Sequence, residues 1–330
     1  MSQHVVIIGA GHAGGTAAAL LRQYGFEGPI TIIGEEPIAP YQRPPLSKAW
    51  LKGEADADSL ALKPVSFYAE AGIDLRLSTR ATEIMRGEKV VLLADDTRVP
   101  YDHLILATGA RARPLHAPGA ALNGIQPLRS AEDAERLKAA LGPGKRLVII
   151  GGGYIGMEAA ASARALGAEA TVVEMQSRIL ARGACETLSR FFEAYHRERG
   201  VGFELGAGVK EFTGENGRVT GVRLSDERVL PCDVALVGIG VVPNEESARA
   251  AGLSCADGIV VDGEARTSDP AIFAIGDVTH RNVALYGRDM RLESVANALE
   301  QAKQGKAGAV AAMMTLLMGM RCSEVIERPV

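Results

Sequence analysis

The chain has 330 residues, 38 of them glycine, with 36 basic against 40 acidic side chains and a formal net charge of −4. Its 47% hydrophobic content is enough for a large core, which excludes global disorder. The balanced charge argues against a nucleic-acid-binding protein, which needs a basic stripe, and the length allows about two domains.

The same unit occurs twice along the chain. An apolar strand at residues 4–8 leads into the glycine turn GAGHAG at 9–14 and a helix rich in small residues. A second such strand at 146–150 leads into GGGYIG at 151–156 and another helix. Each copy continues into a β-rich run that ends in an acid, Glu35 or Glu174. This pattern predicts an α/β protein with two Rossmann-like, parallel-sheet domains.

A late strand at residues 270–277, PAIFAIGD, belongs to neither copy. The simplest chain path returns it to the first sheet, so that the second domain is inserted in the first. We therefore expect a discontinuous first domain of residues 1–113 and 247–330. The second domain is expected at 114–246.

Each glycine turn has the GxGxxG spacing that binds the pyrophosphate of a dinucleotide. The first glycine makes the turn, the second lets the backbone approach phosphate, and the third lets helix and strand pack. The expected positions are Gly9, Gly11, Gly14, Gly151, Gly153 and Gly156. Glu35 and Glu174 are placed to accept hydrogen bonds from ribose hydroxyls. An acid at Glu174 would repel a 2′-phosphate, which favours NAD over NADP.

Two dinucleotide sites in one chain imply a flavin that exchanges electrons with a nicotinamide, since transfer from NAD to NAD is not useful chemistry. Asp277 ends a strand at the carboxyl edge of the first sheet, where ligands bind in open α/β sheets. We expect it to bind the ribityl chain of FAD.

The remaining composition argues against several other classes. The four cysteines and six histidines show no metal-binding spacing, so no metal site is expected. The longest uncharged apolar run, residues 307–320, is too short to span a bilayer. Without a basic stretch before its apolar start, the N-terminus is not expected to be a signal peptide. We expect a soluble cytoplasmic protein.

Six strings together give a resemblance to a known family over nearly the whole chain. They are YQRPPLSK (41–48), YDHLILATG (101–109), GGGYIGMEAA (151–160), GIGVVPN (238–244), TSDPAIFAIGD (267–277) and RLESVANALEQA (291–302). The sequence resembles the FAD-dependent ferredoxin and rubredoxin reductases of oxygenase systems, the putidaredoxin reductase-like family. That resemblance implies the glutathione-reductase type of the two-domain fold.

The resemblance assigns roles to individual residues. The first domain is implied to bind FAD, with Lys48 beside the flavin ring, where it would stabilise the anionic reduced form. The residues implied to contact FAD are Gly9, Gly11, Ala13, Gly14, Glu35, Arg43, Lys48, Ala81, Arg129, Asp277 and Val295. Ser130, beside Arg129, also has the pattern of a helix N-cap. The residues implied to bind NADH in the second domain are Gly151, Gly153, Tyr154, Ile155, Gly156 and Glu174. Glu158 is implied to lie near the nicotinamide and is expected, with Lys48, to be catalytic.

The implied activity is transfer of electrons from NADH through FAD to a small [2Fe–2S] ferredoxin or rubredoxin that serves a P450 or Rieske-type oxygenase. With no cysteine before Cys185, electrons are expected to leave the flavin directly. Two alternatives stay open: an NADH oxidase-like enzyme and a non-catalytic truncated flavoprotein.

The C-terminal residues depart from the family that the sequence resembles. That family has a third, C-terminal domain with an aromatic-rich start, which helps to dock the iron–sulfur partner. Here the family's pattern is lost towards the final residues, SEVIERPV. We therefore expect this interface domain to be absent from the sequence, which affects acceptor docking and not cofactor binding.

Overall fold

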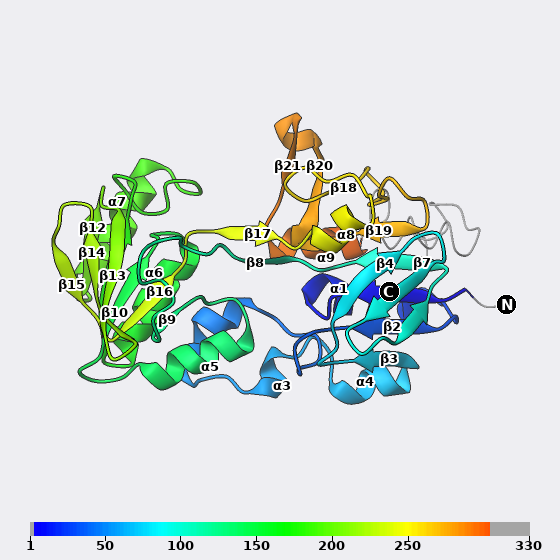
Figure 1. Cartoon of the computed structure of the whole chain (residues 1–330), viewed down its shortest axis with the longest axis horizontal. Coiled ribbons are helices and arrows are strands. Elements are labelled where there is room, and N and C mark those ends of the chain that lie inside the picture. Colours follow the sequence, from blue (N-terminus) through cyan, green and yellow to red (C-terminus); the bar gives the residue numbers. More distant parts are fainter. Residues whose placement is uncertain (1–2, 304–330) are drawn as a thin grey trace. The chain divides into compact units, whose positions relative to one another are not determined.

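A computed structural model describes residues 3–303, in which two units share the chain (Figure 1). The first unit contains the residues up to 42, residues 60–111 and those from 242 onwards. The second unit contains residues 43–59 and 112–241. The C-terminal stretch on which the absence of an interface domain was predicted lies outside the described residues.

The first unit is built on a five-stranded parallel sheet with the strand order β19-β7-β1-β2-β3. Its strands are β1 (Val5–Ile8), β2 (Ile30–Ile33), β3 (Ile73–Arg76), β7 (His103–Leu106) and β19 (Ile272–Ala274). The late strand β19 pairs in parallel with β7, with Phe273 opposite Ile105. The chain therefore leaves the first sheet, builds the second unit and returns, as the sequence predicts.

Further elements complete the first unit around this sheet. They are helices α1 (His12–Gln23), α4 (Val65–Glu70), α8 (Glu246–Ala250) and α9 (Val295–Lys303), the antiparallel strands β4 (Ala81–Met85), β5 (Val90–Leu93) and β6 (Arg98–Pro100), and the strands β18 (Ile259–Val260), β20 (Thr279–Val283) and β21 (Arg288–Arg291). Short 3-10 helices cover Gly276–Val278 and Ala284–Tyr286.

The second unit repeats the same plan with the strand order β12-β11-β10-β16-β9, all parallel. These strands are β9 (Ile125–Gln126), β10 (Arg146–Ile150), β11 (Glu169–Glu174), β12 (Val201–Leu205) and β16 (Val234–Val237). An antiparallel sheet joins β13 (Val209–Glu215), β14 (Arg218–Leu224) and β15 (Val229–Pro231). The helices are α2 (Ala49–Lys52), α5 (Ala131–Ala140), α6 (Tyr154–Ala165) and α7 (Glu186–Arg197), with α3 (Ala57–Leu60) at the unit boundary.

The central strands explain why both sheets form. Every residue of β1 is buried, and β10 is buried from Leu147 to Ile150, as expected for strands covered on both faces. Each leads into a helix that packs small side chains, such as Ala17 and Ala18 in α1, against the sheet. Two short strands, β8 (Ala110–Ala112) and β17 (Val241–Pro243), pair where the chain passes between the units.

The division into units differs from the predicted boundaries most in one segment, and the chain passes between the units at 111/112 and 241/242 where 113/114 and 246/247 were expected. Residues 43–59, which contain the RPPLSK string, were expected in the first domain and group instead with the second unit. The physical reason is a set of contacts with α6 and α5, described below. Within residues 3–303, every helix is too short or too polar to cross a membrane.

Candidate functional site

The first glycine turn is shaped by backbone packing at two of its three glycines. Gly9 has φ +115°, and a Cβ built there would lie 2.2 Å from the carbonyl oxygen of Ala107. A Cβ at Gly14 would lie 2.1 Å from the carbonyl oxygen of Gly9. Both positions therefore require glycine for the fold itself, as the predicted roles of the first and third glycines demand.

The second turn repeats this geometry in the other unit. Gly151 has φ +110°, with its Cβ position 2.4 Å from the carbonyl oxygen of Gly238. A Cβ at Gly156 would lie 2.1 Å from the carbonyl oxygen of Gly151. The backbone N–H of Gly151 donates to Val173 at 2.8 Å, as that of Gly9 donates to Ile33 at 2.8 Å.

The middle glycine of each turn has a different explanation. A Cβ at Gly11 or Gly153 would meet nothing within 4 Å, and neither residue has a positive φ. Each is the N-cap of its helix, with no side-chain cap and no acidic residue in the first turn. Such a helix start is suited to an anion, and the absent side chain leaves room for phosphate to approach the backbone. Both turns therefore fit a dinucleotide.

In the structure, one of the two predicted ribose-binding acids is hydrogen-bonded to the glycine turn of its own unit. Glu174 ends β11, and its Oε2 accepts a hydrogen bond from the N–H of Gly152 at 2.7 Å. Glu35 follows β2 and is 66% exposed, with Oε1 3.5 Å from the Nε of Arg80. The neighbouring Gly34 packs on the first turn, because a Cβ there would lie 2.4 Å from the Cβ of Ala10. The sequence analysis missed Gly34, although its position just before Glu35 was a usable signal.

The loop after β19 lies against the helix of the first turn. Asp277 sits in the 3-10 helix Gly276–Val278, and a Cβ at Gly276 would lie 3.0 Å from the Cβ of Ala13. The N–H of Gly276 donates to Oε1 of Gln301 at 2.8 Å, which ties this loop to α9. The predicted FAD residues Ala13 and Asp277 are therefore near one another, and the buried Gln301 is a supporting residue that sequence reasoning missed.

Two other predicted FAD residues of the first unit lie at the starts of secondary-structure elements. Val295 begins α9 and is 37% exposed. Ala81 begins β4, opposite Leu93, and packs against the core cluster beneath that strand.

The predicted catalytic pair forms an ion pair in the second unit. Nζ of Lys48 lies 2.7 Å from Oε2 of Glu158, and the two side chains are 48% and 29% exposed. Lys48 follows the 3-10 helix Pro44–Ser47, and its Nζ also donates to the carbonyl oxygen of Pro44 at 3.1 Å. Glu158 lies on α6, the helix that begins at the second glycine turn. The arrangement holds a positive charge at a half-exposed position.

Arg43 and Arg129 also meet in this unit. Nη1 of Arg43 donates to the carbonyl oxygen of Arg129 at 2.7 Å. Arg129 precedes α5, whose N-cap Ser130 accepts a hydrogen bond from the N–H of Asp133 at 3.1 Å. The carboxylate of Asp133 accepts from the N–H of Ser130 in return, so the predicted cap is a full capping box.

Tyr154 and Ile155 begin α6 and are the exposed side chains of the second turn. They are 60% and 37% exposed, and the hydroxyl of Tyr154 donates to the carbonyl oxygen of Gly183 at 3.2 Å. Both residues directly follow Gly153, the N-cap of this helix.

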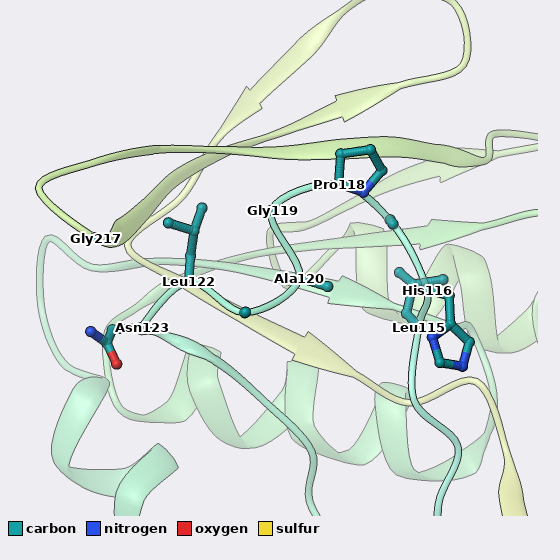
Figure 2. Close-up of a pocket in the computed structure, with 10 residues that line it drawn as sticks. Leu115, His116, Pro118, Gly119, Ala120, Leu122, Asn123 and Gly217 are labelled. Atoms are coloured by element: carbon teal, nitrogen blue, oxygen red, sulfur yellow. The ribbon is translucent and has the colours of Figure 1, made fainter.

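A separate pocket of about 790 Å³ lies elsewhere in the second unit (Figure 2). Its walls are residues 115–123 and Gly217, at the turn of the β13–β14 hairpin. The loop is fixed to the hairpin by the N–H of Asn123, which donates to the carbonyl oxygen of Gly217 at 2.9 Å. None of the predicted site residues lines this pocket.

The cysteines within residues 3–303 are free thiols. Cys232 is 1% exposed, and burial together with the carboxylate of Asp233 raises its pKa to about 12. Burial also raises the pKa of Cys255. These two thiols are poor redox nucleophiles, because the thiolate is the reactive form.

This environment gives a simple prediction for thiol chemistry. Iodoacetamide at pH 8 should alkylate the exposed Cys185 and leave Cys232 unmodified in the folded protein. Peptide mass spectrometry before and after unfolding in urea measures both sites. Rapid modification of Cys232 in the folded protein would contradict the burial of this thiol.

Two parallel sheets, each with a glycine turn that opens a helix, define a dinucleotide-dependent α/β oxidoreductase. The family model described as pyridine nucleotide-disulphide oxidoreductase matches residues 3–302. A probable ferredoxin reductase of Castellaniella defragrans is 54% identical, over 95% of this chain and 76% of its own length. The rubredoxin-NAD(+) reductase of Pseudomonas putida is 42% identical, over 91% of this chain and 78% of its own length. In the crystal structure of a covalent putidaredoxin reductase–putidaredoxin complex, the similar chain has a TM-score of 0.90 and 41% identity, over 94% of this chain and 75% of that one.

The chain therefore belongs to the ferredoxin/rubredoxin reductase family of the pyridine nucleotide-disulphide oxidoreductases, and it is an enzyme of the ferredoxin–NAD(+) reductase type. The family and fold predicted from the sequence are confirmed. A water-forming NADH oxidase, which is 22% identical, is similar in fold alone.

Proposed function

We propose that this protein takes electrons from NADH and passes them, through FAD, to a small iron–sulfur protein, either a [2Fe–2S] ferredoxin or a rubredoxin. The duplicated glycine turn carries the proposal, because it provides one dinucleotide site in each unit. The acceptor class follows from the relatives, which are named as ferredoxin and rubredoxin reductases, one of them crystallised with putidaredoxin. A P450 or Rieske-type oxygenase is the proposed terminal user of the electrons, and the cytoplasm is the proposed location.

The first unit is the proposed FAD-binding domain. The N–H groups at the start of α1 would bind the pyrophosphate beyond Gly11, Glu35 would accept hydrogen bonds from a ribose, and Asp277 would bind the ribityl hydroxyls. Val295, at the start of α9, and Ala81, at the start of β4, are proposed backbone contacts. When bound, FAD accepts a hydride from NADH and releases electrons singly to the acceptor.

The second unit is the proposed NADH-binding domain. The start of α6 would bind the pyrophosphate at Gly153, and Glu174 would accept hydrogen bonds from the adenosine ribose. Tyr154 and Ile155 exclude water from the phosphates. Glu158 holds the Lys48 ammonium by the ion pair described above, and this positive charge would stabilise negative charge on a reduced flavin ring bound beside it. Arg43 and Arg129 add positive charge to the same unit.

Anaerobic mixing with NADH tests the proposal directly. The flavin absorbance should bleach within seconds at millimolar NADH, and a [2Fe–2S] ferredoxin should then speed cytochrome c reduction over that with cytochrome c alone. An unchanged flavin spectrum would identify a non-catalytic flavoprotein. Bleaching that is reversed when air is admitted, with no effect of ferredoxin on cytochrome c reduction, would identify an NADH oxidase.

The nicotinamide preference should depend on the charge of Glu174. In Glu174→Arg, the change from a repelling carboxylate to an attracting guanidinium should shift kcat/KM towards NADPH on the order of 100-fold. Glu174→Gln is the matched control, since it removes the charge but keeps an oxygen for the N–H of Gly152, and should shift the preference less. Equal preferences in all three proteins would contradict the ribose role of Glu174.

A further inference from the structure

The segment that carries Lys48 is attached to α6 at two points one helical turn apart. The hydroxyl of Ser162 donates to the carbonyl oxygen of Ser47 at 2.7 Å. The hydroxyl of Ser47 donates to Oε2 of Glu158 at 2.6 Å, and Nζ of Lys48 lies 2.7 Å from the same oxygen. Glu158 and Ser162 are four residues apart on α6, so they share one face of the helix.

The two serines are more deeply buried than the ion pair that they support. Ser47 is 5% exposed and Ser162 is 3% exposed, whereas the Lys48 side chain is 48% exposed. A half-exposed Lys–Glu pair is weakly held by itself, because both long side chains lose entropy when they are fixed. A hydrogen bond from a buried hydroxyl to a carboxylate is short and strong, and it restricts the carboxylate to one orientation.

The backbone contact of Ser162 lies directly beside Lys48. Lys48 lies between the 3-10 helix Pro44–Ser47 and α2, with φ −122° and ψ −108°, outside the regular helical region. The Ser162 hydroxyl fixes the peptide immediately before this residue. The backbone next to Lys48 is therefore hydrogen-bonded to α6, and the carboxylate that pairs with its ammonium belongs to the same helix.

We propose that Ser47 and Ser162 are positioning residues for the Lys48 ammonium. Ser162 fixes the backbone of Ser47, Ser47 orients Glu158, and Glu158 holds Lys48. The same α6 opens at Gly153, so one rigid helix sets the distance between the NADH-binding turn and the ammonium. The role in hydride transfer rests on the proposed function, whereas the positioning of Lys48 does not.

The first test measures the Lys48 amine itself, without turnover. The full-length flavoprotein is labelled with a limiting amine-reactive reagent, and peptide mass spectrometry compares Lys48 with Lys52, which pairs with Glu54 at 2.6 Å. Ser47→Ala should raise the Lys48/Lys52 labelling ratio about tenfold, as loss of one hydrogen bond to a charged group implies. Ser47→Thr keeps the hydroxyl and should restore the ratio. Ser225→Ala removes an exposed serine of the same unit and is the matched control.

Ser162→Ala should raise the labelling ratio by a smaller factor, because it loosens the backbone but leaves the Ser47 hydroxyl in place. Anaerobic stopped-flow kinetics then measure flavin reduction by NADH in the same proteins. Ser47→Ala should slow the limiting rate about tenfold at an unchanged NADH Kd, and Ser47→Thr should recover it.

The outcomes separate two kinds of failure. An unchanged labelling ratio in Ser47→Ala, with a lower urea midpoint, would overturn the proposal and leave Ser47 a purely structural residue. A raised ratio in a protein whose flavin is not reduced by NADH would support the positioning of Lys48 and refute the proposed function. A raised ratio with an unchanged rate of flavin reduction would overturn the catalytic consequence.

Discussion

Gly153→Val should abolish NADH binding, with an increase in Kd of about 100-fold or more, while FAD stays bound. The Cβ of the valine has room within the protein, since a Cβ there has no neighbour within 4 Å and the backbone is extended. Its methyl groups would instead occupy the space through which the pyrophosphate reaches the start of α6. Isothermal titration with NADH and the flavin absorbance of the purified protein measure the two properties separately.

Gly11→Val is the reciprocal variant and should lose FAD instead, because Gly11 has the same open surroundings at the start of α1. Gly87→Val is the matched control: its Cβ also meets nothing, and it lies in the turn between β4 and β5. NADH binding by Gly153→Val with the affinity of the control would show that the second turn does not bind a dinucleotide.

Gly9→Ala should lower the free energy of unfolding by about 3 kcal/mol or more, although it adds only a methyl group. Its φ of +115° is strained for any residue with a Cβ, and the new atom would lie 2.2 Å from the Ala107 carbonyl oxygen. Backbone of β1 and of the segment after β7 would have to separate. Urea unfolding followed by fluorescence and circular dichroism measures the change.

The neighbouring Gly11→Ala separates this structural effect from cofactor binding. Its free energy of unfolding should lie within about 1 kcal/mol of that of the native protein, because the Cβ of an alanine there meets no neighbour and the glycine that it replaces is at the helix cap. Equal stabilities of Gly9→Ala and Gly11→Ala would mean that the first turn is not packed as described.

The sequence predicted those parts of the site that are set by local backbone geometry. Gly9 and Gly151 were recognised from the strand before them and the helix after them, and the structure gives both the positive φ that the turn requires. Ser130 was recognised as an N-cap from its position before an acidic helix start. The return of β19 was predicted because its sequence belongs to neither copy of the repeat and the simplest chain path returns it to the first sheet.

Contacts between distant segments could not be predicted in the same way. Ser47 and Ser162 are separated by more than a hundred residues, and nothing in either local sequence shows that their hydrogen bond exists. That contact, together with the one between Arg43 and Arg129, places residues 43–59 with the second unit. The packing of Gly34 on Ala10 could not be predicted from local sequence either, because it depends on how two strand ends meet.

The pairing of β19 with β7 has a consequence for biosynthesis. β7 ends at Leu106 and β19 begins at Ile272, so the edge of the first sheet stays open while the intervening chain emerges from the ribosome. Contacts this far apart close slowly, because a long loop must be ordered before they form. The contiguous residues 112–241 can assemble their own sheet during that wait. An exposed β7 edge is open to wrong strand partners in the interval, and chaperone dependence of the yield should therefore rise when translation is slowed between β16 and β19, because the edge then stays exposed for longer.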